Sequence, residues 1–271
     1  MKTFVIDLDR CNGCYACQLA CKDEMVGNEW PPYSKPQPQT GQFWLKMFEK
    51  VHGQVPKVRV EYRPEMCRHC DEAPCIAAAP EAVYKRDDGL VIVDPEKAKG
   101  ARGLVDACPY GAIYFNEELD LAQKCTGCAH LVDAGKLPHC VDACATGALR
   151  FGEEEEFADE LAGESADVRE PFAVAGTKPR VHYLHPFGLF VSGEVWDPAA
   201  DLIIEGAEVK LVSDDGEVRL TATDGFGDFW FRHLKAGSYE LHIEAEGFEP
   251  VTREIDLAES LNIGDFPLEK K

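Results

Sequence analysis

The sequence predicts an α+β fold in two parts, a cysteine-rich N-terminal part and an all-β C-terminal part. All 12 cysteines of the 271-residue chain lie within residues 1–150. The charge divides at the same place, since residues 1–150 carry a net charge of −3 and residues 151–271 one of −18. From about residue 179 onward apolar and polar residues alternate, as in half-buried strands. We therefore expect a domain at 1–150, an acidic linker or helix at 151–180, and a seven-stranded all-β domain at 181–271.

Short elements joined by loops make up the N-terminal part. Residues 4–7, 58–62 and 90–94 are apolar and β-branched enough to predict short strands. The prolines between Trp30 and Pro38 exclude a regular helix or a central strand, because proline lacks the backbone donor. We expect an insertion loop on the surface there.

The acidic segment begins with four consecutive glutamates, Glu153 to Glu156. Phe157 and Leu161 follow at helical spacing, which predicts a solvated helix or linker between the domains. An acidic docking strip is the alternative.

Period-two alternation marks the C-terminal part at residues 207–212, 218–222 and 239–243. Turn signals such as Asp214-Asp215-Gly216 and Asp224-Gly225 separate these runs. Short strands at this spacing predict an all-β sandwich or small barrel of about seven strands.

The overall charge of −21 excludes several classes of function. Nucleic acids and anionic lipid surfaces both attract basic patches, so we expect no nucleic-acid partner. No apolar run approaches the roughly 20 residues of a membrane helix, so we expect no membrane span. The first residues resemble neither a secretory signal nor a twin-arginine signal, and we expect a cytoplasmic protein, with export on a partner's signal as the alternative.

The cysteines form four groups. The first, Cys-x-x-Cys-x-x-Cys-x-x-x-Cys, lacks only the final proline of the bacterial ferredoxin run. In that run three thiolates hold one 4Fe–4S cluster and the fourth binds a second cluster. The groups are Cys11, Cys14, Cys17 and Cys21; Cys67, Cys70 and Cys75; Cys108 alone; and Cys125, Cys128, Cys140 and Cys144.

This crossing rule pairs segments that are distant in the sequence. It predicts three complete ligand sets: Cys11, Cys14, Cys17 and Cys144; Cys125, Cys128, Cys140 and Cys21; and Cys67, Cys70, Cys75 and Cys108. A fourth set would need one cysteine before Pro80, to complete the second group, and three more at three-residue spacing before Cys108. These positions hold Ala79, Ala98, Ala101 and Leu104. One whole set is missing and no cysteine is left over, so we expect three 4Fe–4S clusters.

A zinc site and disulfides are the alternative interpretations of the cysteines. The last group alone is compatible with a zinc ribbon, whereas the closely spaced first group fits a cubane better. Disulfides are disfavoured in a chain without an export signal. Lys124, directly before Cys125, is either an exposed lysine or a group that offsets cluster charge. We assign no ligand role to His69, His130 or His139, because each predicted cluster already has four thiolates.

The cysteine groups, with Cys108-Pro109-Tyr110-Gly111-Ala112 and Gln123-Lys124-Cys125-Thr126-Gly127-Cys128, resemble the iron–sulfur subunits of the dimethyl sulfoxide reductase family. The resemblance implies two ferredoxin-like modules. It also implies a large partner subunit that holds molybdenum, or tungsten, on two pterin guanine dinucleotides. The missing set corresponds to the cluster nearest the membrane anchor in that family.

Within the family, the chain resembles small subunits of the pyrogallol–phloroglucinol transhydroxylase type, which have three clusters and a C-terminal β-domain. The similar stretches include Asn28-Glu29-Trp30-Pro31 and Gly176-Thr177-Lys178-Pro179. The C-terminal part resembles transthyretin-like or carboxypeptidase-regulatory domains, an immunoglobulin-type sandwich. The resemblance implies an electron-transfer subunit, itself without catalytic residues, in a heterodimer that acts on phenols as a transhydroxylase or a hydroxylase. The alternatives are a free-standing multi-cluster carrier and a zinc-stabilised interaction module.

Overall fold

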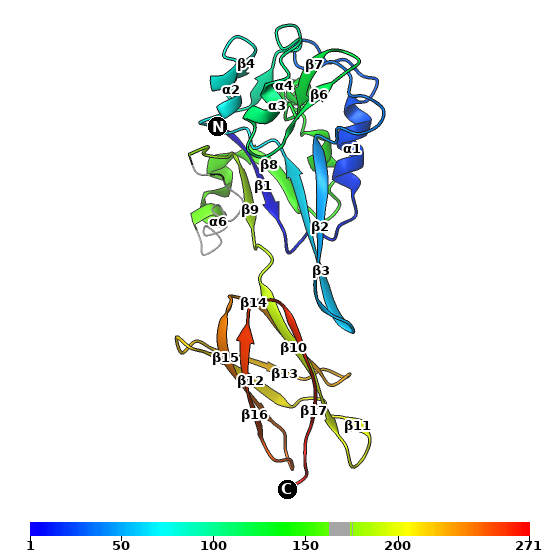
Figure 1. The fold of residues 1–271 in the computed structure, drawn as a ribbon, viewed down its shortest axis with the longest axis vertical. Coiled ribbons are helices and arrows are strands. Elements are labelled where there is room, and N and C mark those ends of the chain that lie inside the picture. The colour runs from blue at the N-terminus through cyan, green and yellow to red at the C-terminus, as the bar shows by residue number, and fades with distance from the viewer. Residues whose placement is uncertain (163–173, 175) are drawn as a thin grey trace. The chain divides into compact units, whose positions relative to one another are not determined.

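The computed structural model describes residues 1–162, 174 and 176–271 (Figure 1). These residues form two compact units. Unit 1 comprises residues 1–49 and 62–186, and unit 2 comprises residues 50–61 and 187–271. Among the described residues, none of the helices is long and apolar enough to cross a membrane.

A three-stranded sheet crosses unit 1 with the N-terminal strand at its centre. Strand β1 (Lys2–Asp7) pairs antiparallel with β8 (Leu149–Glu153) and parallel with β9 (Val181–Leu184). Because β1 lies between these two strands, its apolar run from Phe4 to Ile6 is buried. Residues 181–184 therefore belong with the cysteine-rich part, and the boundary lies at 186/187 rather than at 181.

Two hairpins and five short helices carry the cysteine loops. The hairpins are β4 (Val83–Lys85) with β5 (Val91–Val93), and β6 (Ile113–Asn116) with β7 (Leu121–Lys124). The helices are α1 (Ala16–Met25), α2 (Pro74–Ala78), α3 (Leu104–Ala107), α4 (Ala129–Asp133) and α5 (His139–Asp142). Each helix contains a cysteine or directly adjoins one, so the helices place thiols rather than build an extended layer.

The long hairpin of β2 (Leu45–Gln54) and β3 (Lys57–Met66) contributes to both units. Its tip belongs to unit 2, where the Lys57 ammonium pairs with the Asp228 carboxylate. The side-chain amide of Gln54 donates to the Ser260 carbonyl at 3.2 Å and accepts from the Asn262 N–H at 2.9 Å. The assignment of all residues 1–150 to one domain is therefore wrong for this tip, because its polar groups find their partners in the β-unit.

Unit 2 contains two four-stranded sheets around one apolar core. Alternation places Val209, Leu211, Leu241 and Ile243 in that core, as the sequence pattern predicts. Eight strands are present where about seven were expected, and one has only two residues. They are β10 (Leu189–Asp197), β11 (Leu202–Ile203), β14 (Asp228–Leu234) and β17 (Leu261–Pro267) in one sheet, and β12 (Glu208–Ser213), β13 (Val218–Ala222), β15 (Gly237–Glu244) and β16 (Val251–Leu257) in the other.

The acidic segment folds against unit 1 where it is described. A 3₁₀ turn, η1 (Glu154–Phe157), leads into α6 (Ala158–Ala162). Phe157 and Leu161 are buried with Val5 of the central strand. The segment is therefore a packed helical turn over this stretch, and most of the rest of the predicted linker, residues 163–173 and 175, lies outside the described residues.

Candidate metal centre

The first cysteine loop lies close to Cys144, which is more than 120 residues away in the sequence. Burial raises the pKa of the Cys17 thiol to about 12, and the neighbouring thiols of Cys11, Cys144 and Cys14 contribute to this rise. Cys14 is exposed and Cys11 and Cys144 are half-buried. These four thiols are called set I below.

Glycine shapes this loop for a steric reason. Gly13 has a φ of +69°, and a Cβ built on it would lie 2.4 Å from the Tyr62 ring. A small residue here also lets backbone amides approach a bound cluster. The structure adds that Tyr62 leaves no room for a side chain.

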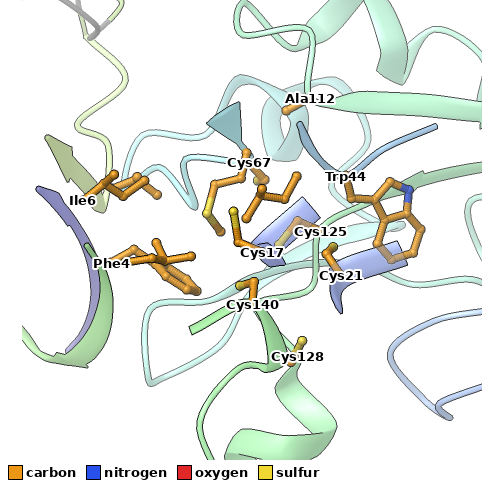
Figure 2. Close-up of a cluster of buried hydrophobic side chains, with 14 of the residues drawn as sticks. Phe4, Ile6, Cys17, Cys21, Trp44, Cys67, Ala112, Cys125, Cys128 and Cys140 are labelled. Carbon is orange, nitrogen blue, oxygen red and sulfur yellow. The ribbon is translucent and has the colours of Figure 1, made fainter. Parts of the chain in front are cut away.

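A second group of thiols lies deep in unit 1 (Figure 2). Burial raises the pKa of Cys21 well above its ordinary value, with further contributions from the Cys125 and Cys128 thiols. Burial likewise raises the pKa of Cys140, whose neighbours are Cys128, Cys21 and Cys125. These four buried cysteines are called set II below.

The third group brings Cys108 to the second cysteine loop. Burial raises the pKa of Cys70 to about 12, and the thiols of Cys67, Cys75 and Cys108 add to the effect. We call these four thiols set III.

The three sets follow one another through the unit. Cys17 of set I acts on Cys140 of set II, and Cys67 of set III acts on Cys125 of set II. Figure 2 draws these side chains within one cluster of buried residues. Set II therefore lies between the other two.

The four positions that lack cysteine lie together in an apolar cluster. Ala79, Ala98 and Leu104 are buried there, and Ala101 packs against them. Cys75 and Cys108 of set III adjoin the same cluster. Apolar side chains thus fill the region beyond set III.

The donor chemistry of the three sets fits iron–sulfur clusters. Closely spaced thiols that are mostly buried resist ionisation, and the positive charge of bound iron would offset this resistance. Among the described residues, no group of three or more His, Cys, Asp or Glu side chains is arranged to hold a single metal ion. A cubane is larger than one ion and spreads its four thiolates further apart.

Backbone and side-chain donors are directed at several of the sulfurs. The N–H groups of Gly127 and Leu149 donate to the sulfurs of Cys125 and Cys144, each at 3.3 Å. Burial acts to raise the pKa of Cys144, but hydrogen bonds from residues 146–149 outweigh it and lower that pKa. Such bonds stabilise negative charge on sulfur and tune the potential of a bound cluster.

Two further buried polar groups were not predicted as functional. The N–H of Val91 donates to His69 Nδ1 at 3.0 Å, which places the proton of the neutral ring on Nε2. Nε2 is buried without a protein partner, and so is the hydroxyl oxygen of Thr126. Both residues lie between two cysteines of a Cys-x-x-Cys pair, where the sulfur of a bound cluster would be an acceptor. Their position within the Cys-x-x-Cys spacing was the only sequence signal.

Lys124 is a buried cation. Its ammonium donates to the carbonyls of Val91 and Cys125. Burial acts to lower the pKa of Lys124, but the thiols of Cys67, Cys75 and Cys125 outweigh it and raise that pKa. The alternative of an exposed lysine is therefore wrong.

The remaining histidines near the cysteines contact a carboxylate. Glu24 lies 2.8 Å from His130 Nε2 and 2.9 Å from His139 Nδ1. His130 also stacks on Trp30 with ring centroids 4.2 Å apart. These contacts give one nitrogen of each imidazole a carboxylate neighbour, whereas His130 Nδ1 is buried without a hydrogen-bond partner.

Comparison with known families agrees with this division of the chain. A 4Fe-4S dicluster domain matches residues 58–154, and a carboxypeptidase regulatory-like domain matches residues 191–269.

Curated relatives match over most of the chain. The pyrogallol hydroxytransferase small subunit of Pelobacter acidigallici is 41% identical over 90% of this chain and 90% of its own. One subunit of the tetrathionate reductase of Salmonella typhimurium is 34% identical over 69% of this chain and 74% of its own. One chain of the anaerobic dimethyl sulfoxide reductase of Escherichia coli is 35% identical over 68% of this chain and 84% of its own.

Proposed function

Since this protein is a member of the family of iron–sulfur subunits of dimethyl sulfoxide reductase-type enzymes, we propose that it is the electron-transfer subunit of a molybdenum enzyme that acts on phenols. It binds three 4Fe–4S clusters, one in each of sets I, II and III. The observation that carries this proposal is the gathering of thiols from distant segments into three groups of four. A bound cluster supplies one-electron chemistry, accepting and returning a single electron.

The finer fold assignment belongs to the same proposal. Unit 1 consists of two ferredoxin-like modules, and the similar hairpins β4–β5 and β6–β7 support this interpretation. Unit 2 is a transthyretin-like sandwich of the immunoglobulin type, supported by its two sheets around one core.

The three sets differ in how far their cysteines are exposed at the protein surface. Set II is buried throughout, whereas set I includes the exposed Cys14. Set I is therefore the end at which the protein exchanges electrons with its catalytic partner. Beyond set III the apolar side chains around Leu104 exclude a fourth cluster, so the series of clusters ends there.

The proposed partner is based on the relative that matches over 90% of both chains. The relative from Pelobacter acidigallici is named as the small subunit of a pyrogallol hydroxytransferase. We infer a heterodimer in which a large subunit holds molybdenum, or tungsten, on two pterin guanine dinucleotides and accepts a phenolic substrate. In this arrangement the present chain makes and breaks no bonds in the substrate.

Paired cysteine variants test the ligand sets. Cys17 and Cys21 lie one helical turn apart on α1, yet Cys17→Ala should remove the same cluster signal as Cys144→Ala. Cys21→Ala should instead remove the signal that Cys125→Ala removes.

Electron paramagnetic resonance of the dithionite-reduced complex, purified without oxygen, distinguishes the signals. Each single variant should retain about eight of about twelve irons, because one cluster of four is lost. The crossed assignment is wrong if Cys17→Ala and Cys21→Ala remove the same signal.

A further inference from the structure

A cavity of about 200 Å³ lies in unit 1 beside the loop that follows Cys108. It is built where strands begin and end, because Trp44 precedes β2, Met66 ends β3 and residues 109–112 precede β6. Trp44, which is labelled in Figure 2, and Met66 are buried and give the cavity an apolar side. We call this space the Arg68 cavity, after the buried arginine in its wall.

Arg68 is a buried cation without a carboxylate partner among the described residues. Its side chain is only 6% exposed, and Nε and Nη1 have no hydrogen-bond partner in the described part of the chain. The guanidinium lies over the rings of Tyr183 and Tyr110, 4.6 and 5.3 Å from their centroids. Tyr110 is itself a wall of the cavity, so this stack places the guanidinium there. A buried cation with unused N–H groups favours an anionic ligand, because both the charge and the donors are costly when left alone.

The other polar groups of the cavity add to this preference. The indole N–H of Trp44 is buried and has no hydrogen-bond partner among the described residues. Lys46 contributes an exposed ammonium. The Glu65 carboxylate also lines the cavity, but Arg63 donates to its Oε1 from Nε at 3.2 Å and from Nη2 at 2.9 Å. Positive charge therefore exceeds negative charge around the cavity.

Aromatic rings form two further walls. The Tyr110 hydroxyl lies 2.6 Å from the Thr177 hydroxyl oxygen, and the Tyr114 hydroxyl donates to the Phe43 carbonyl at 2.9 Å. Since these hydroxyls already have partners, the two rings contribute mainly apolar surface. A cavity of about 150 Å³ is large enough to hold benzene, so the volume suits one substituted ring.

We propose that the Arg68 cavity binds a single-ring aromatic carboxylate of the benzoate class. The ring packs against the aromatic walls, and the carboxylate accepts hydrogen bonds from Arg68 and from the indole of Trp44. A short aliphatic acid lacks the ring contacts. A phenol is neutral at pH 7, because its pKa is about 10, and lacks the charge. The inference concerns binding alone and does not depend on the proposed ligand sets.

Photoaffinity labelling locates the site. The probe is 4-azidobenzoate, photolysed with the complex purified without oxygen and without added reductant. Mass spectrometry should find the label on peptides that contain Trp44, Met66, Tyr110 or Tyr114, which separates this site from any site on the catalytic partner. Benzoate should suppress this label at concentrations at least tenfold lower than acetate or phenol requires. This experiment decides the inference without any variant.

Charge-removing variants test the recognition of the carboxylate. Arg68→Gln should reduce labelling of these peptides at least tenfold, because the charge-assisted hydrogen bonds are lost. Lys46→Met should reduce it about two- to fivefold, since water screens an exposed charge. Lys97→Met is the matched control for Lys46→Met, because it removes an exposed ammonium that does not line the cavity. Iron analysis of each variant shows whether the arginine is also needed for a neighbouring cluster.

Three results would overturn the inference. Label confined to other peptides contradicts the site. Suppression by acetate or phenol as effective as that by benzoate contradicts the ligand class. Full labelling in Arg68→Gln contradicts the role of the guanidinium. An unlabelled cavity in the parent protein, together with loss of iron from Arg68→Gln, would instead assign this charge to the set III cluster alone.

Discussion

The set I loop offers a sharp test of its geometry through one glycine and a matched control. Gly13 and Gly41 have almost the same left-handed backbone, with φ of +69° and +68°. They differ in their surroundings, because a Cβ on Gly13 meets the Tyr62 ring at 2.4 Å and a Cβ on Gly41 meets nothing within 4 Å.

The two alanine variants separate two energies. Gly41→Ala reports the backbone term alone, about 1–2 kcal/mol for an L-residue in this region. Gly13→Ala adds a clash with an aromatic ring, and forced overpacking costs about 1–3 kcal/mol more. For a unit of this size, about 1 kcal/mol corresponds to roughly 2–4 °C in melting temperature.

Anaerobic thermal unfolding and iron analysis of both variants form the assay. Gly13→Ala should melt several degrees below Gly41→Ala and should lose the set I signal selectively, because the loop between Cys11 and Cys17 is displaced. Equal melting temperatures and full iron in both variants would refute the packing of Tyr62 against this loop.

Three more predictions concern other parts of the chain. Leu104→Ala should destabilise unit 1 by about 2–5 kcal/mol through the cavity it leaves, yet retain full iron, since no ligand is expected there; loss of iron would contradict this. Asp71→Asn should cost about 1–3 kcal/mol through weaker bonds to Arg180 and Lys85, as measured by thermal unfolding. Burial acts to raise the pKa of Asp71, but these two cations outweigh it and lower that pKa. Its contribution is therefore present above the unfolded-state pKa near 4 and is lost as the pH falls through the folded-state pKa. Equal stability of Asp71→Asn and the parent protein at neutral pH would argue against this role. Deletion of residues 187–271 should leave the clusters in place while it weakens assembly with the catalytic partner, and complete loss of iron would show that unit 1 depends on unit 2.

The cysteine pattern is readable from the sequence because cluster loops are local. Spacings of two and three residues fix which thiols of one segment can meet, and the crossing rule then supplies the distant partner. The absence of a fourth set could be inferred in the same way, because Ala79, Ala98, Ala101 and Leu104 occupy its positions. The alternation in residues 207–243 likewise predicts buried strands, since its period matches the pleat.

Long-range partners of short segments could not be predicted. Residues 181–184 have the composition of any buried strand, and nothing local indicates that they pair with β1 rather than with the β-domain. The tip of the β2–β3 hairpin joins unit 2 through Lys57 and Gln54, whose partners lie more than 170 residues away. The burial of Phe157 could not be predicted either, because the glutamates that precede it are equally compatible with a solvated helix.

The position of Lys124 shows a further limit of sequence reasoning. Its neighbour in the sequence, Cys125, is a set II ligand, and its ammonium donates to the carbonyls of Cys125 and Val91. Adjacency indicated a group close to a cluster, and only the fold shows that the side chain is buried and that Val91 is its second partner.

Elemental analysis of the native protein, purified without oxygen under mild conditions, tests the central claim most directly. Three 4Fe–4S clusters and a catalytic partner predict about twelve irons per chain together with molybdenum or tungsten. The same iron without either metal would contradict the molybdenum partner and favour a free-standing carrier. Zinc in place of iron would contradict the electron-transfer function altogether.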